Sequence, residues 1–278
     1  MRTITLILIF IGTSFFAFGQ EEPLLSKKGR VILPEKGDFA VGLSANPFFD
    51  YAGNLLSSSG NNTLRSRLLD NNVFFSKYFI SDKLALRLKL RLNQGKSTLT
   101  NKVVSFASPS AQVEDKLEQK SSVLEFTPGI EFRSGSSRLQ VAYGGEIIIA
   151  KDKIQSSYTY GNNFATNNTS PLSTIDFNNK TSGFTTSRPT ESIPTDNFRF
   201  GIRAFIGLEY FFAPKMSVGS EIGLGYSKVN GGDTRSVSEF WDVVQNQRRL
   251  NTISGAGGDS RNLGTDTFNG QIFVLFYL

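Results

Sequence analysis

Hydrophobic and polar side chains alternate without interruption along residues 83–93, where five leucines occupy every second position. The positions between them are largely cationic and include Arg87, Lys89 and Arg91. In a helix, residues two apart would be spread around the whole circumference, whereas in a strand they project from one side. The segment is therefore predicted to be a β-strand with one apolar face and one basic face.

The same period-two alternation recurs along the chain. Together these segments predict eight strands, at residues 39–46, 72–80, 83–93, 123–133, 138–149, 198–210, 216–226 and 268–278. The connections alternate between short turns and long polar loops, and the long loops are predicted at 52–70, 94–119, 152–195 and 230–264. In an up-and-down arrangement, all short turns then lie at one end with both chain termini, and all long loops lie at the other.

This sorting of the connections favours a membrane-spanning barrel. Outer-membrane barrels combine an even strand number with short periplasmic turns, long extracellular loops and an apolar band flanked by aromatic residues. We therefore predict an all-β fold, an eight-stranded antiparallel up-and-down transmembrane β-barrel whose leucines face lipid. An open sheet edge in lipid leaves backbone groups unpaired, so the first and last strands should pair. A soluble lipocalin-like binder, whose leucines face a second sheet or a ligand, is the alternative fold.

Two local features carry specific expectations. A three-residue turn at 81–83 pairs Tyr78 and Ile80 with the leucine face and places Lys77 on the polar face. Pro128 lies inside the predicted strand 123–133. Because proline cannot donate a hydrogen bond to a neighbouring strand, we expect a bulge at this residue.

The N-terminus has the pattern of an export signal. Arg2 precedes an apolar run from Ile4 to Phe18, and small residues follow at the spacing used for cleavage. We predict a signal peptide at 1–19, a periplasmic lead-in at 20–36 and the barrel at 37–278. An uncleaved helical anchor is the alternative, although the apolar run is shorter than the roughly 20 residues that span a membrane.

Composition excludes several chemistries. The chain contains no cysteine and no histidine, which removes disulfides, thiolate metal sites and every Ser-His, Cys-His or His-metal arrangement. We therefore expect that the protein is not an enzyme and that it binds no cofactor and no metal. Acid–base catalysis by carboxylates alone is the remaining alternative. The net charge of +6 is scattered along alternating strand positions rather than clustered, so nucleic acid is not an expected partner.

The polar faces of the predicted strands place many charges inside the barrel. These residues are Lys77, Arg87, Lys89, Arg91, Glu125, Glu131, Arg133, Arg138, Glu146, Arg199, Arg203, Glu209 and Glu221. One interpretation is a structural network of paired charges, because eight strands leave just enough room for side chains to fill the interior. The other is an ion pathway with a ladder of cations. We favour the network, since open aqueous channels belong to barrels of about 16 or more strands.

The last long loop contains candidate contact residues. Phe240 and Trp241 precede the basic pair Arg248 and Arg249, and this segment is predicted to extend the barrel strands as a hairpin that contacts an extracellular partner. Aspartates 233, 242 and 259 carry oxygen ligands of the kind that calcium prefers, but their spacing matches no calcium motif. We interpret them as turn residues.

Two segments resemble a known family. The ending 270–278, Gly-Gln-Ile-Phe-Val-Leu-Phe-Tyr-Leu, looks like the C-terminal strand by which outer-membrane proteins are recognised for assembly, although that strand more often ends in Phe. Residues 36–54, with Asn-Pro-Phe-Phe-Asp-Tyr at 46–51, are similar to the opening of small barrels common in Bacteroidetes outer membranes. In architecture the chain resembles OmpA-type and OmpX-type barrels.

This resemblance implies a location in the outer membrane, with surrounding lipid and the barrel-assembly machinery as partners. It implies a structural, adhesion or surface-interaction role, exercised through the loops on an extracellular partner that the sequence does not identify. Transport of a small solute or ion, through the barrel or sideways from it, is the alternative function.

Overall fold

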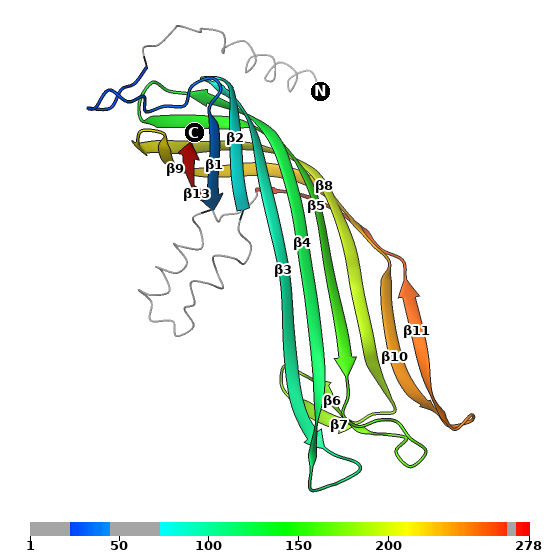
Figure 1. Ribbon diagram of the computed structural model, residues 1–278. Helices are drawn as coiled ribbons and strands as arrows, with labels where there is room; N and C mark the ends of the chain where they lie inside the picture. Colours follow the sequence, from blue (N-terminus) through cyan, green and yellow to red (C-terminus); the bar gives the residue numbers. More distant parts are fainter. Residues whose placement is uncertain (1–22, 45–72, 266–270) are drawn as a thin grey trace, which may run out of the picture.

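The computed structural model describes residues 23–44, 73–265 and 271–278 (Figure 1). The predicted signal peptide 1–19, the first residues of the lead-in, the predicted loop 52–70 and the start of the predicted last strand lie outside the described residues. In the described part of the chain, no helix is long and apolar enough to cross a membrane.

The described residues form thirteen β-strands, and every pairing is antiparallel. They are β1 (Phe39–Ser44), β2 (Val73–Ser81), β3 (Leu84–Val104), β4 (Gln112–Ser134), β5 (Leu139–Thr159), β6 (Leu172–Asp176), β7 (Thr181–Phe184), β8 (Ser187–Ala213), β9 (Met216–Gly231), β10 (Thr234–Asp242), β11 (Gln247–Gly255), β12 (Asp259–Thr265) and β13 (Gln271–Tyr277).

Within the described ranges, eight of these strands close into a hydrogen-bonded ring. Its order is β1, β2, β3, β4, β5, β8, β9 and β13, and β13 pairs with β1 from Ala40↔Tyr277 to Ser44↔Phe273. The expected pairing of the first and last strands is therefore confirmed. Ring strands follow one another in chain order, so all short turns lie at the end where the C-terminus meets β1 (Figure 1).

Five ring strands, β3, β4, β5, β8 and β9, are longer than predicted, and three of the predicted loops are wrong. Residues 94–104 and 112–119 form the parts of β3 and β4 that lie away from the short turns. Residues 152–195 include the end of β5, the β6–β7 hairpin and the start of β8, and 230–264 include β10, β11 and most of β12. Figure 1 shows β3, β4, β5 and β8 leaving the ring as a long curved sheet, with β10 and β11 at its edge. Backbone hydrogen bonds pair these largely polar segments along their whole length, and a small apolar cluster of Leu117, Tyr160 and Phe177 packs on their inward face.

The two local expectations have different outcomes. The register Tyr78↔Leu86 and Lys77↔Arg87 confirms the pairing inferred from the turn, with an irregularity near Ser81. The bulge at Pro128 is wrong, because β4 keeps one register along β3 and the same register with β5 before and after the proline. The pairing of β4 with β5 is interrupted only at Thr127 and Pro128, because proline has no N–H to donate.

The two faces of the ring differ in chemistry. On β3, Leu86 and Leu92 are 49% and 52% exposed, whereas Arg87 and Lys89 are 4% and 7% exposed. The same alternation in the other ring strands directs apolar side chains outward, among them Phe39, Val41, Phe74, Tyr78, Leu124, Phe126, Ile130, Phe132, Ile147, Phe200, Ile206, Tyr210, Ile222, Leu224 and Phe276. The ring therefore has an apolar outer surface and a polar interior.

Closure of the ring depends on close backbone approach at Gly42. A Cβ at this position would overlap the backbone oxygen of Val274 on β13. We expect Gly42→Ala to lower the free energy of unfolding by about 1–3 kcal/mol, because β1 or β13 must shift. Gly264→Ala is the matched control, since a Cβ on Gly264 of β12 meets nothing within 4 Å and its effect should stay within about 0.5 kcal/mol. Urea titration of both variants checks this, and equal losses would contradict it.

Candidate functional site: the interior of the ring

Strand register brings nine of the thirteen predicted interior charges into one buried network, among the residues that the structure describes. Each comes from an inward position of a ring strand, so that five cations from β2, β3, β4 and β8 meet four glutamates from β4, β5, β8 and β9. The nine residues are Lys77, Arg87, Lys89, Arg133, Arg203, Glu131, Glu146, Glu209 and Glu221.

The half of the network nearer the short turns is centred on Glu131. Its carboxylate accepts hydrogen bonds from Lys77 Nζ at 2.8 Å, Arg87 Nη1 at 3.0 Å and Arg133 Nε at 3.0 Å. Glu209 completes this half. It accepts from Lys77 at 3.1 Å and also from Arg133 and the Tyr277 hydroxyl.

The other half joins β3 to β5, β8 and β9. Arg87 Nη2 donates to Glu221 at 2.8 Å, and its Nε lies 2.8 Å from Glu146. Arg203 Nη1 lies 2.7 Å from Glu146 and 3.1 Å from Glu221, and Lys89 contacts the same two carboxylates. Each glutamate thus serves more than one cation, which is the arrangement that compensates charges removed from water.

Aromatic rings fill the space around these cations. The guanidinium of Arg87 lies 4.0 Å from the ring centre of Phe205, and Arg133 lies 5.1 Å and 5.5 Å from the rings of Phe79 and Phe211. Phe205 shares the polar face predicted for its strand, but sequence reasoning missed the other interior rings, Phe75, Phe79, Phe211, Phe273 and Tyr277. For three of these rings the signal was present, because Phe75 and Phe79 share the strand face of Lys77 and Phe211 shares that of Glu209, whereas β13 carries no charge to mark its inward face.

The four remaining predicted interior residues lie outside the network. Arg91 and Glu125 form a pair at 2.5 Å, and their side chains are 24% and 21% exposed. Arg199 lies 3.9 Å from Asp152 and is more exposed still, while Arg138 donates to the backbone oxygens of Phe211 and Phe212 at the turn end. These residues lie toward the ends of the ring, where water reaches the side chains.

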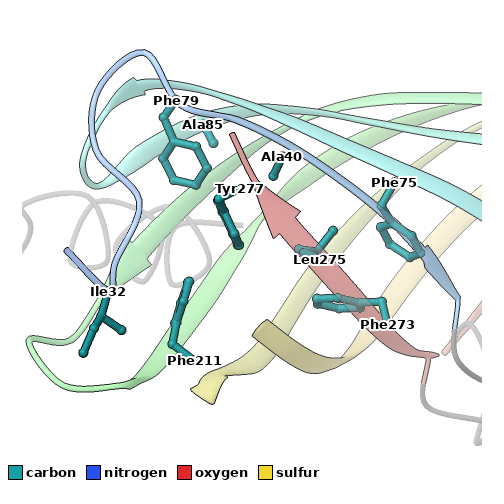
Figure 2. Packing of buried hydrophobic residues seen from close by; sticks show 9 residues of the cluster. All are labelled: Ile32, Ala40, Phe75, Phe79, Ala85, Phe211, Phe273, Leu275 and Tyr277. Atoms are coloured by element: carbon teal, nitrogen blue, oxygen red, sulfur yellow. The ribbon is translucent and has the colours of Figure 1, made fainter. Parts of the chain in front are cut away.

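The lead-in closes the turn end of the ring. Ile32 is 1% exposed and packs with Phe79, Phe211 and Tyr277, as Figure 2 shows. The ring centre of Tyr277 lies 5.8 Å from that of Phe79 and 5.3 Å from that of Phe211. The full cluster is Ile32, Ala40, Phe75, Phe79, Ala85, Phe211, Phe273, Leu275 and Tyr277. The members of this cluster at the turn end therefore form an apolar plug with Ile32, while Phe75 and Phe273 lie beside Lys89 and Lys77 of the network.

Backbone hydrogen bonds hold this plug in place. The Ile32 oxygen accepts from the Lys215 N–H at 3.2 Å, and the Lys36 N–H donates to Asp82 at 2.8 Å. Lys215 Nζ also contacts Asp38 at 2.5 Å. The lead-in, predicted only as a polar segment, is thus tied to two of the short turns.

The candidate loop residues lie on the β10–β11 hairpin. Register pairs Phe240 with Arg249 and Trp241 with Arg248, and β10 also pairs with β8, which confirms the expected hairpin. Arg248 lies 3.0 Å from Glu239 and Arg249 lies 3.1 Å from Asp242. All four residues are at least partly accessible, so the hairpin presents them beyond the ring.

Asp242 acts as a turn residue. Backbone N–H groups of Gln245 and Val244 donate to its carboxylate, and together with Arg249 they lower its pKa. Among the described residues, no group of three or more His, Cys, Asp or Glu side chains is placed to hold a metal ion.

A second buried cluster stabilises the extension beyond the ring. Asp115 accepts from the Gly161 N–H at 2.8 Å and from the Thr174 N–H at 2.7 Å, which ties the β6–β7 hairpin to β4. Arg188 lies 2.7 Å from Glu239 and 4.1 Å from the ring centre of Tyr160, whose pKa is raised by burial. The extension is therefore an ordered part of the protein rather than a set of separate loops.

These features define a class of protein: a closed antiparallel ring with an apolar exterior, a charge-paired interior and a long sheet beyond one rim. No protein-family model matches the chain, and no curated protein matches it. Among solved structures, the chain is similar to the outer membrane protein OprG from Pseudomonas aeruginosa at 9% identity. That likeness covers 88% of this chain and 98% of OprG with a TM-score of 0.32.

Proposed function

We propose that the protein is an eight-stranded outer-membrane β-barrel of the OmpA or OmpX kind, exported by the segment 1–19. Its short turns face the periplasm, its extension faces outward, and its role is structural, adhesive or another surface interaction rather than enzymatic. The observation that carries this proposal is the combination of an outward apolar belt with a buried, charge-paired interior. A soluble protein would bury the belt and expose the charges.

The height of the belt supports this assignment. On β3 it runs from Leu84 to Leu92, about 26 Å along the strand at ~3.3 Å per residue, and on β8 from Phe198 to Tyr210, about 40 Å. With a strand tilt of ~40°, these lengths correspond to about 20 and 30 Å across the membrane. They bracket the apolar band of ~25 Å found in outer-membrane barrels.

The interior favours a closed barrel over a transporter. A solute crossing the ring would have to separate several fully buried ion pairs and then displace the cluster around Ile32. Removing one partner of a buried pair costs about 3–5 kcal/mol, so an open path is unfavourable. The partners in this proposal are lipid, the barrel-assembly machinery during insertion, and an extracellular ligand at the extension.

Fractionation with gel migration and bilayer conductance tests the proposal. We expect the full chain in the outer-membrane fraction, with an unboiled band whose migration shifts on boiling, and no steady conductance after reconstitution. Recovery in the soluble fraction without detergent would overturn the barrel and favour a lipocalin-like binder. Anion-selective conductance whose selectivity reverses in Arg87→Glu would replace the sealed interior with transport.

A further inference from the structure

The outer wall changes from apolar to cationic at one level across three neighbouring strands. Leu92 on β3, Leu124 on β4 and Ile149 on β5 are exposed outward residues at the end of the apolar belt that lies away from the short turns. Four residues beyond each, on the same face, lie Lys96, Lys120 and Lys153. Four residues correspond to about 13 Å along a strand, within reach of a lysine side chain and a lipid headgroup.

These lysines border a groove. It has a volume of about 480 Å³, and its floor is the β3–β4 ladder at Gly95 and Ser121. The lining residues are Gln94, Gly95, Lys96, Lys120, Ser121, Ser122, Lys153 and Gln155, which are donors or small residues and include no carboxylate.

The charge of the groove is only partly balanced by the protein. Register places Lys96 opposite Lys120, and Glu118 accepts from both, at 2.6 Å and 3.0 Å, which lowers its pKa. Register places Lys153 opposite Asp196 of β8, but the ion pair within 4 Å that Asp196 forms is with Lys151, at 3.3 Å. Glu191, the other carboxylate nearby, accepts from Gln155 at 3.1 Å. Glu118 already joins the facing pair Lys96 and Lys120, so the three lysines that line the groove share one bound carboxylate and keep an excess of positive charge.

We propose that this groove binds the phosphate of a phosphorylated membrane lipid, whose acyl chains lie along Leu92 and Leu124. The proposal rests on the barrel proposed above and adds a ligand class to its outer wall. We choose a lipid rather than a soluble anion because the apolar belt lies next to the lysines, on the side of the short turns. A lipid whose phosphate binds the lysines can therefore lay its acyl chains on the belt. A polynucleotide would need a basic track on the extension, whereas Lys96, Lys102, Lys116 and Lys120 there alternate with Glu114 and Glu118.

Titration of the folded full chain with short-chain phosphatidic acid tests the proposal. The protein is held in a zwitterionic detergent, and the readout is the temperature at which the heat-modifiable band is lost. We expect phosphatidic acid to raise this temperature and short-chain phosphatidylcholine or inorganic phosphate to leave it unchanged. In Lys120→Gln/Lys153→Gln the apparent dissociation constant should rise about thirty-fold at low salt, with a smaller difference at high salt.

Lys102→Gln/Lys116→Gln is the matched control. It removes the same charge from the outward face of the neighbouring β3–β4 ladder, farther from the ring than the groove, and it should bind like the wild type. Equal weakening in both variants, an unchanged constant in the groove variant, or an equal rise with inorganic phosphate would overturn the lipid site while leaving the barrel intact. Absence of any heat-modifiable band would overturn the barrel and the lipid site together.

Discussion

Glu131→Gln is expected to lower the free energy of unfolding by about 3–5 kcal/mol. The carboxylate is fully buried and neutralises Lys77, Arg87 and Arg133 at distances of 2.8 to 3.0 Å. An amide of nearly the same shape keeps the packing but leaves these cations without that charge and turns one acceptor into a donor. Urea titration in lipid vesicles, followed by the heat-modifiable band, measures the loss.

Glu125→Gln provides the control for this substitution. Glu125 lies on the same strand and the same inward face, but its partner Arg91 is partly accessible to water. Because water screens the pair, we expect a loss of about 1 kcal/mol or less. Similar losses at both positions would contradict the assignment of Glu131 as the centre of a dehydrated network.

Leu88→Arg is expected to lower the free energy of unfolding by about 2–4 kcal/mol in a bilayer. Leu88 is the middle of the five outward leucines of β3 and lies opposite Pro128 on β4. A guanidinium there must remain in hydrocarbon or distort the surrounding lipid. The measurement is the same urea titration.

Thr98→Arg separates the membrane effect from a general effect of arginine. Thr98 lies on the same strand and the same outward face, ten residues further along, where the surface is polar and exposed. The change should alter stability by no more than about 0.5 kcal/mol. If both substitutions are tolerated equally, the leucine face does not contact lipid.

Much of the ring was predictable because a strand exposes its side chains with a period of two. Alternation separated Leu86 and Leu88 from Arg87 and Lys89, and a short turn allowed the register between Lys77 and Arg87 to be inferred before any contact was known. Closure followed from the cost of an open edge. These features depend on local geometry and on the hydrogen-bonding needs of the backbone.

The strand extensions were not predictable in the same way. Residues 94–104 and 112–122 have only scattered apolar residues, such as Leu99 and Leu117, so their pattern is typical of a loop. They nevertheless pair residue by residue from Gln94↔Ser122 to Val104↔Gln112. Beyond the ring, β3 and β4 remain extended because each supplies backbone hydrogen bonds to the other. Long-range pairing of this kind leaves almost no periodic signal in polar segments.

The candidate site was likewise predictable only in part. Local alternation identified the charged inward positions, but it did not show that Glu131 serves three cations while Arg138 and Arg199 remain outside the network. Those differences depend on height along the ring and on access of water. The plug around Ile32 was not predicted, because the short apolar run 31–33 has no period that indicates which residue enters the ring.

Period two and the two kinds of connection therefore establish the strands of the ring, their inward and outward faces and their order. Assembly of the ring decides which charges share a partner, which aromatic rings enclose them, how the lead-in closes the turn end and how three lysines from three strands border one groove. The physical reason is that faces are set by bonds between neighbours in the chain, whereas partners are set by register between residues far apart in it.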